Sequence, residues 1–312
     1  MFRTFDRASS LPAFIFGAAV AAAAWTCTPD ALAQPANRFG ATADASPAHR
    51  YFSEFSYVTP STLHLGATEF GDVDTLSARV SWQNTVRIND SWSGIAGFDV
   101  HGTWFDVPGA APIPDSLYET SARLGGIWRL NERWTFQGTL SPGLYSDLRD
   151  IDGGDFNVPG LLLAFWQVDD RLQLIAGAGF NARRDLPVIP ALGARWRFAD
   201  DWTLLAIFPT PRIEYRVNEA LTAFVGAELV RSAYRVSEHF GDRFGRPDLN
   251  DQDVSYNEWR VGAGARWNIG RAIAVSFDAG WMGEREFNFH DSGFELTSDG
   301  APYVQISVGG RY

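Results

Sequence analysis

The chain has 312 residues, and its 37 acidic and 26 basic side chains give a formal charge of −11. Hydrophobic residues make up 46 % of the chain and aromatic residues 14 %, which is enough apolar material to exclude a disordered protein. The one cysteine excludes a disulfide scaffold, and the negative charge disfavours binding to nucleic acid. A helical membrane protein is disfavoured too, because beyond the N-terminal region no apolar run reaches roughly 18–20 residues.

The N-terminal region has the three parts of a secretory signal. Two arginines precede an apolar stretch over 11–24, and Ala31 and Ala33 place small residues before a cleavage site. We expect residues 1–33 to be a signal peptide. Residues 34–48 are small, polar and aperiodic, which predicts a flexible segment. The alternatives are a lipoprotein signal, which would use the one cysteine, and a short membrane anchor.

Apolar and polar side chains alternate from residue 49 onward. Over 259–268 the odd positions hold Trp, Val, Ala, Ala and Trp, and the even positions hold Arg, Gly, Gly, Arg and Asn. A period of two places these sets on opposite faces of a β-strand. Similar stretches recur to the end of the chain, and no stretch of comparable length has the period of an amphipathic helix. We therefore predict one all-β domain over 49–312.

Short and long connections largely alternate between the predicted strands. The short turns lie at 89–90, 131–132, 169–170, 200–201, 218–219 and 270–271, and the long connections at 107–117, 147–157, 237–253 and 288–301. Membrane β-barrels sort their connections in this way, with short periplasmic turns and long outer loops. The turns predict an antiparallel up-and-down transmembrane β-barrel of about fourteen strands. Twelve strands is the alternative, because 59–74 is ambiguous and prolines interrupt 208–211.

The tryptophans support the same interpretation. Those that lie within five residues of a short turn are Trp92, Trp128, Trp134, Trp166, Trp196, Trp202 and Trp267. Such rings belong where hydrocarbon meets water, so the cluster predicts an aromatic girdle around a barrel. The alternative is that these are core residues of a soluble β-protein.

The polar face of the predicted strands carries many arginines and a few carboxylates, and in a barrel this face lines the lumen. The candidate pore-lining residues are Arg79, Arg123, Arg129, Arg195, Arg197, Arg212, Glu214, Arg216, Glu228, Arg260, Arg266 and Asp278. An arginine-rich lumen would attract anions. The alternative is a closed lumen that is filled by arginine–carboxylate pairs.

The last predicted strand, 303–312, ends on an aromatic residue. Barrels of the Gram-negative outer membrane characteristically close with such a strand, and the chain resembles them over 49–312. More narrowly, the segment LLAIFPTPRIEYRVN at 204–218 resembles a recurrent stretch in a family of uncharacterised outer-membrane barrels, which has no assigned activity. The resemblance implies an outer-membrane location. It also implies outer-membrane lipids, lipopolysaccharide and the barrel-assembly machinery as partners, and it leaves the oligomeric state open.

Signals for catalysis and metal binding are weak. His290 and Ser292 share a predicted outer loop and are residue types that acyl-chain hydrolysis uses, but such pairs are common in polar loops. Clustered acidic residues over 150–155 and 248–253 offer oxygen ligands for Ca²⁺, or for ions that bridge to lipopolysaccharide. Neither cluster has the glutamate that completes a helix–loop–helix calcium site. We therefore expect no catalytic residue, no metal site and no cofactor.

The expected function is a pore or passive transporter for small hydrophilic solutes. The alternatives are a structural or surface-interaction barrel with a plugged lumen and an outer-membrane lipid hydrolase.

Overall fold

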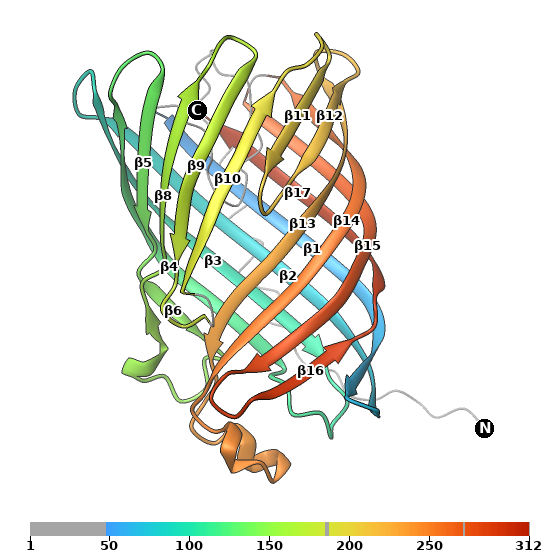
Figure 1. Ribbon diagram of the computed structural model, residues 1–312. Coiled ribbons are helices and arrows are strands. Elements are labelled where there is room, and N and C mark those ends of the chain that lie inside the picture. Colours follow the sequence, from blue (N-terminus) through green and yellow to red (C-terminus); the bar gives the residue numbers. More distant parts are fainter. Residues whose placement is uncertain (1–47, 185–186, 271, 312) are drawn as a thin grey trace.

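The computed structural model describes residues 48–184, 187–270 and 272–311. These residues form a closed antiparallel up-and-down barrel of 14 strands, which confirms the predicted fold class and strand number (Figure 1). Within these ranges no helix is long and apolar enough to cross a membrane. The predicted signal peptide at 1–33 and nearly all of 34–48 lie outside the described residues.

The wall is built from strand pieces that follow one another around the barrel. In chain order they are β1 (Ala48–Leu65), β2 (Thr68–Arg87), β3 (Trp92–Asp106), β4 (Ser116–Arg129), β5 (Trp134–Leu140), β6 (Gly143–Ser146), β7 (Phe156–Asn157), β8 (Gly160–Gln167), β9 (Leu172–Phe180), β10 (Val188–Trp196), β11 (Trp202–Ile207), β12 (Arg212–Arg216), β13 (Leu221–Arg235), β14 (Asp253–Ile269), β15 (Ile273–Phe289), β16 (Phe294–Ser298) and β17 (Ala301–Arg311). The pairs β5 with β6, β7 with β8, and β16 with β17 each share one wall position. The barrel closes where β17 pairs with β1, with Ile306 opposite Phe55.

The two ends of the barrel differ in their connections. One end, uppermost in Figure 1, carries the short turns, and we call it the short-turn end. The opposite end is the long-loop end, where the connections hold the 3-10 helices η1 (Gly153–Asp155), η2 (Gly241–Phe244) and η3 (Pro247–Leu249).

Four of the short turns are closed in the same way. Asn89, Asn131, Asp169 and Asn218 each accept hydrogen bonds from the backbone N–H groups two and three residues later, at 2.7–2.9 Å. An Asn or Asp side chain in this position stands in for a backbone acceptor and fixes a tight turn. The sequence chemistry at these positions therefore sets the phase of the hairpins.

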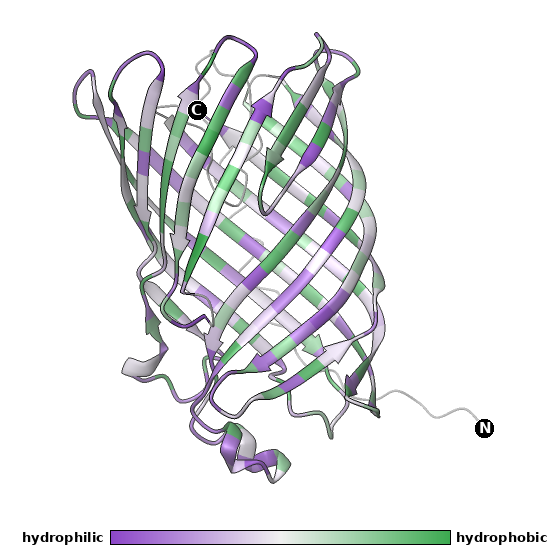
Figure 2. Cartoon of the chain, in the orientation of Figure 1, coloured by the Kyte–Doolittle hydropathy of each residue, from purple (hydrophilic) through white to green (hydrophobic). Residues whose placement is uncertain are grey.

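The outer face of the wall is apolar. Figure 2 shows hydrophobic and hydrophilic residues alternating along the strands, as a period of two requires. Large apolar side chains that point outward and are exposed include Phe55, Phe98, Leu124, Leu162, Leu192, Val225, Val261, Phe277, Val304 and Ile306. A soluble protein does not expose so continuous an apolar surface, whereas a bilayer covers one.

The predicted aromatic girdle forms at the short-turn end. Trp92 stacks on Trp128 across β3 and β4 with 5.6 Å between ring centroids, and Trp134 stacks on Trp166 at 5.7 Å. These rings are on the outer face and remain partly exposed. They are therefore not core residues of a soluble β-protein, and the girdle interpretation stands.

One segment that the sequence leaves ambiguous is settled at the long-loop end, and one prediction there is wrong. The ambiguous segment 59–74 belongs to β1 and β2, which form one long hairpin with register shifts after Val58 and Leu63 and a turn that contains Gly66, at φ +58°. The predicted loop 288–301 is largely the hairpin of β15 and β16. Each segment extends a strand ladder beyond the apolar band, where side chains no longer alternate by hydropathy and the periodic signal is lost.

The wall is shortest at β11 and β12. Their hairpin ends at 208–211, and the backbone of Leu229 on β13 donates to Pro209 O at 3.0 Å. Beyond this point β10 and β13 continue on either side of the missing wall, and no pairing joins them over the described residues. Further towards the long-loop end Arg235 of β13 pairs with Ser146 of β6, which narrows the rim.

Candidate functional site

An apolar cluster fills the long-loop end of the interior. We call it the apolar plug, and its members are Leu63, Val73, Phe105, Ala111, Ile113, Leu117, Tyr145, Tyr234, Val236, Phe240, Leu249, Val254, Tyr256, Phe287, Phe289, Phe294 and Leu296. Most of these residues point inward from the strand ends, and the others come from the two connections at 107–115 and 236–252.

The plug joins strands that are not neighbours in the wall. The ring of Phe105 on β3 lies 5.2 Å from that of Phe287 on β15 and 5.5 Å from that of Tyr256 on β14. Three wall strands separate β3 from β15. At about 4.8 Å per strand the two strands are much further apart along the wall than their rings are. These side chains therefore meet through the interior rather than along the wall, and they fill this part of the lumen.

A buried charge network lies next to the plug, on the side of the short-turn end. Glu258 contacts Arg260 at 2.5 Å and Arg285 at 3.7 Å, and Tyr256 donates to the Glu258 carboxylate at 2.5 Å. All four side chains are buried. Because one carboxylate serves two guanidinium groups in a dry environment, the pairing is structural rather than an exposed pore lining.

The register of β15 explains how Arg285 reaches the interior. Odd positions of β15 face outward up to Trp281, but Arg285 faces inward, because one extra residue on β15 shifts its pairing with β14 between Glu258 and Arg260. Gly283 lies at this bulge, where a Cβ would come within 1.9 Å of the Trp259 indole. A constant period of two predicts the wrong face for Arg285.

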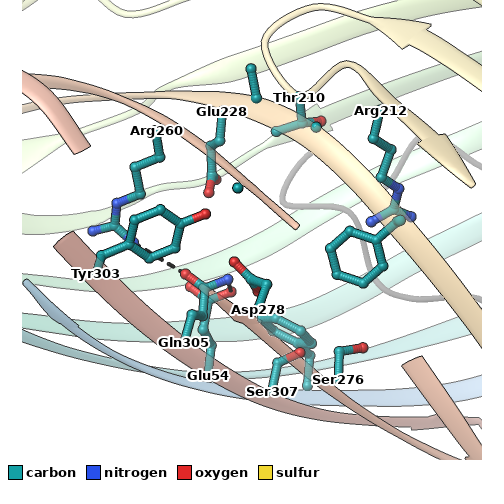
Figure 3. A pocket seen from close by; sticks show the side chains of 15 residues that line it. Glu54, Thr210, Arg212, Glu228, Arg260, Ser276, Asp278, Tyr303, Gln305 and Ser307 are labelled. Carbon is teal, nitrogen blue, oxygen red and sulfur yellow. Dashed lines mark hydrogen bonds between the residues drawn. The ribbon is translucent and has the colours of Figure 1, made fainter. Parts of the chain in front are cut away.

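Next to this network, towards the short-turn end, the interior contains a polar cavity of about 120 Å³, which we call the Tyr303 cavity (Figure 3). Glu54, Glu228 and Asp278 line it together with Arg260 and Arg212. Gln305 bridges two of these groups, since it accepts from Arg260 at 3.1 Å and donates to Glu54 at 3.0 Å. The cavity thus offers both signs of charge to a small ligand.

A second cavity, of about 210 Å³, lies beside the first, and Glu228 lines both. We call it the central cavity. Arg123 contacts Asp99 at 2.5 Å and Arg79 contacts Glu119 at 3.3 Å within it. Its lining holds four arginines and three carboxylates, and the charged members are Arg79, Arg123, Arg184, Arg231, Asp99, Glu119 and Glu228.

A third cavity, of about 80 Å³, lies in the short part of the wall, and we call it the wall pocket. Leu163, Ile175 and Ile207 line it from the interior side, where they belong to a buried apolar cluster. Leu192 and Phe208 line it from the outer face, where they are 66 % and 46 % exposed. The pocket therefore has walls on both faces of the barrel.

The twelve candidate residues fall into two groups. Arg79, Arg123, Arg212, Glu214, Glu228, Arg260, Arg266 and Asp278 are inside the barrel and at least half-buried, whereas Arg129, Arg195, Arg197 and Arg216 are exposed near the short turns. Glu214 contacts both Arg212, at 2.8 Å, and Arg266, at 3.2 Å. The interior placement of the first eight residues fits the predicted inward face. That they line a transport path remains a prediction.

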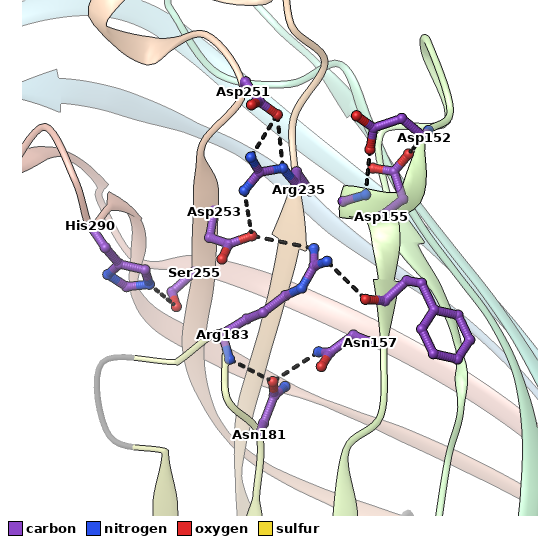
Figure 4. Close-up of polar contacts among 12 residues, drawn as sticks. Asp152, Asp155, Asn157, Asn181, Arg183, Arg235, Asp251, Asp253, Ser255 and His290 are labelled. Carbon is purple, nitrogen blue, oxygen red and sulfur yellow. Dashed lines mark hydrogen bonds and ion pairs between the residues drawn. The ribbon is translucent and has the colours of Figure 1, made fainter.

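His290 and Ser292 do not form a catalytic pair. Ser292 donates its hydroxyl to the backbone of Phe289, whereas His290 contacts the Ser255 hydroxyl at 2.7 Å (Figure 4). The side chain of His290, directly after β15, thus contacts a residue of the neighbouring strand β14. Asp253, two residues before Ser255, contacts Arg183 at 3.3 Å and Arg235 at 3.6 Å.

The two acidic clusters are used for local structure. Asp152 and Asp155 cap η1 reciprocally, and Asp251 pairs with Arg235 at 2.7 Å (Figure 4). Over the described ranges no three histidine, cysteine or acidic residues lie close enough together to hold a metal ion.

Sequence reasoning missed three features of the interior. Arg285 was hidden by the bulge, and the carboxylates that pair with arginines, among them Asp99 and Glu119, were not singled out although they share the polar parity of β3 and β4. The wall pocket had one signal, the Pro-Thr-Pro segment at 209–211, which marks where the strands stop.

The fold and the outer face define the chain as a β-barrel of the outer-membrane type. It belongs to the family described as "Domain of unknown function (DUF6268)", whose model matches residues 109–308. No curated protein matches the chain.

Solved barrels share the architecture at low identity. The "TodX monoaromatic hydrocarbon channel deltaS2 mutant" is 9 % identical, with a TM-score of 0.48, and the match covers 89 % of this chain and 93 % of that one. The COG4313 outer membrane channel from Pseudomonas putida F1 is also 9 % identical, with a TM-score of 0.46, and covers 85 % and 96 %. Such likeness concerns the fold alone.

Proposed function

We propose that this protein is an outer-membrane transport barrel that carries a small molecule through its interior, with the short-turn end in the periplasm. The supporting observation is the chain of three cavities. Glu228 joins the Tyr303 cavity to the central cavity, and Arg184 and Leu229 join the central cavity to the wall pocket. A barrel with a purely structural role has no need of a series of adjoining internal cavities.

The apolar plug argues against a wide passive pore. A dry, aromatic layer across the lumen is a barrier to ions and to hydrophilic solutes, because it offers no group that replaces their hydration. The prediction of a general pore for hydrophilic solutes, with anions favoured, is therefore kept only as a prediction that the polar cavities on the short-turn side of the plug bind such solutes.

The second candidate is a surface-interaction barrel with a closed interior. The plug and the covering connections at 107–115 and 236–252 favour it, because they present a closed surface at the long-loop end.

Uptake distinguishes the two functions. Host cells without their own general porins would express the protein, and entry of radiolabelled sugars, amino acids and aromatic acids would be measured. Gly309→Trp is the blocked variant: Gly309 lies opposite Phe52, which lines the Tyr303 cavity, and a Cβ there meets nothing closer than 3.7 Å. Gly94→Trp is the matched control, because Gly94 lies opposite the outward-facing Val86 and has equal space.

Transport predicts uptake of at least one solute class that Gly309→Trp lowers and Gly94→Trp does not. Uptake of every class at the level of cells without the protein contradicts it and favours the closed barrel.

A further inference from the structure

The junction between the wall pocket and the central cavity combines two chemistries in one place. The wall pocket is lined almost wholly by aliphatic and aromatic side chains, with Leu163, Ile175 and Ile207 on its inner side. The central cavity is lined by charged groups, with one more guanidinium than carboxylate. Arg184 and Arg231 line both.

Arg184 is an incompletely satisfied donor at this junction. Its Nη2 donates to the backbone carbonyl of Arg231 at 2.6 Å, whereas its buried Nε has no hydrogen-bond partner among the described residues. Burial, together with the positive charge of Arg231, lowers the pKa of Arg184. A buried guanidinium with an unmade hydrogen bond is costly, and an anionic oxygen would satisfy it.

The wall pocket also meets the outer face of the barrel. Leu192 and Phe208 are exposed on that face, and the edges of β10 and β13 flank the pocket without pairing to each other over the described residues. A molecule that is dissolved in the bilayer would therefore meet an apolar opening here, in a wall that is otherwise closed by main-chain hydrogen bonds.

We infer that this junction binds a small amphipathic organic acid, with its apolar part in the wall pocket and its carboxylate on Arg184. The inference rests on the proposed transport function and adds a ligand class and a route through the wall. An aromatic or short aliphatic acid fits best, since a closed apolar cavity of about 150 Å³ accommodates benzene, and this pocket of about 80 Å³ shares five lining residues with the central cavity of about 210 Å³. The charge balance of the central cavity favours an anion.

A pair of fluorinated probes tests the ligand class. The protein would be placed in lipid nanodiscs, and binding of 4-fluorobenzoate and of its neutral analogue 4-fluorobenzamide would be followed by fluorine NMR against empty nanodiscs. We expect saturable binding of the benzoate and at least about tenfold weaker binding of the benzamide, the factor that corresponds to about 1.4 kcal/mol.

Two variants locate the site. Gly179 lines both cavities and a Cβ there meets nothing closer than 3.9 Å, so Gly179→Trp places an indole ring at the junction from a position with room for its Cβ. We expect Gly179→Trp to abolish binding of both probes, and Arg184→Gln to lower benzoate binding to the level of benzamide. Gly94→Trp, on the outward face, should bind both probes as the wild type does.

The inference is overturned if the wild-type protein binds the two probes equally. It is also overturned if benzoate binding survives Gly179→Trp, or if Arg184→Gln leaves the preference intact in a protein that still shows heat-modifiable migration on gels. The binding test needs no transport. If benzoate binds as expected and the uptake experiment fails for every solute, the proposed function falls while the binding site stands. If a solute is taken up but benzoate does not bind, the proposed function stands and the inferred binding site falls.

Discussion

The two halves of the barrel interior are built on the same strands but have opposite properties. Towards the long loops the inward side chains are large and apolar, and Phe105, Tyr256 and Phe287 meet across the lumen. Towards the short turns many of them are arginines and carboxylates around cavities, beside the apolar cluster that contains Leu163, Ile175 and Ile207. One alternating wall can therefore hold a sealed end and a ligand-sized space, and Glu258, with its two arginines, stands between them.

The boundary between the halves should be the most sensitive position. Glu258→Gln would leave Arg260 and Arg285 buried without their shared counter-charge, so we expect a loss of about 3–5 kcal/mol in the free energy of unfolding. Urea titration in phospholipid vesicles, followed by tryptophan fluorescence, measures it. The control Glu219→Gln changes an exposed turn residue and should cost less than about 0.5 kcal/mol. Equal losses in both variants would remove the boundary role of Glu258.

A cavity introduced into the apolar plug should lower the free energy of unfolding. Phe287 is fully buried in the plug, so Phe287→Ala should leave a cavity and cost about 3 kcal/mol or more. The same titration measures the loss. Phe277→Ala on the outer face of the same strand leaves no internal cavity and should cost less. A greater loss at Phe277 would mean that the plug is loosely packed.

The aromatic girdle at the short-turn end should contribute to the free energy of unfolding. Trp134 stacks on Trp166 and on Phe136, so Trp134→Ala should cost about 1 kcal/mol beyond the area that it exposes. Trp134→Phe keeps an aromatic ring and should cost less in the same measurement. Indistinguishable values for the two variants would show that the stacking is not stabilising.

The smallest effect is expected at Asp147, in the connection after β6. Burial raises the pKa of this carboxyl, although it accepts backbone hydrogen bonds from Arg149 at 3.0 Å and Ser237 at 3.2 Å. A raised pKa in the folded state means that Asp147 stabilises the fold below its unfolded pKa of about 3.9, and that this contribution is lost as pH rises through the folded pKa.

Asp147→Asn keeps an acceptor and does not titrate. Unfolding measured between about pH 4 and pH 7 should therefore shift in favour of the Asn variant as pH rises. A shift in favour of the wild type would mean that the hydrogen bonds outweigh burial.

How far the sequence predicts the molecule depends on whether a signal is local. The Asx turns at Asn89 and Asn131 and the period of two are local, so the fold class, strand number and girdle follow from them. The face of Arg285 depends on a bulge that shifts the register, and the meeting of Phe105 with Phe287 depends on closure of the barrel. Neither feature can be predicted from a short stretch of sequence, so the plug and the cavities became visible only in the structure.

The central claim is that the interior is sealed at the long-loop end, and conductance across a planar bilayer tests it most directly. The account predicts no stable open-channel current from folded wild-type protein, and current steps from Phe287→Ala or from a variant that lacks 239–250, because each removes part of the plug. Steady open-channel current from the wild-type protein would contradict the claim.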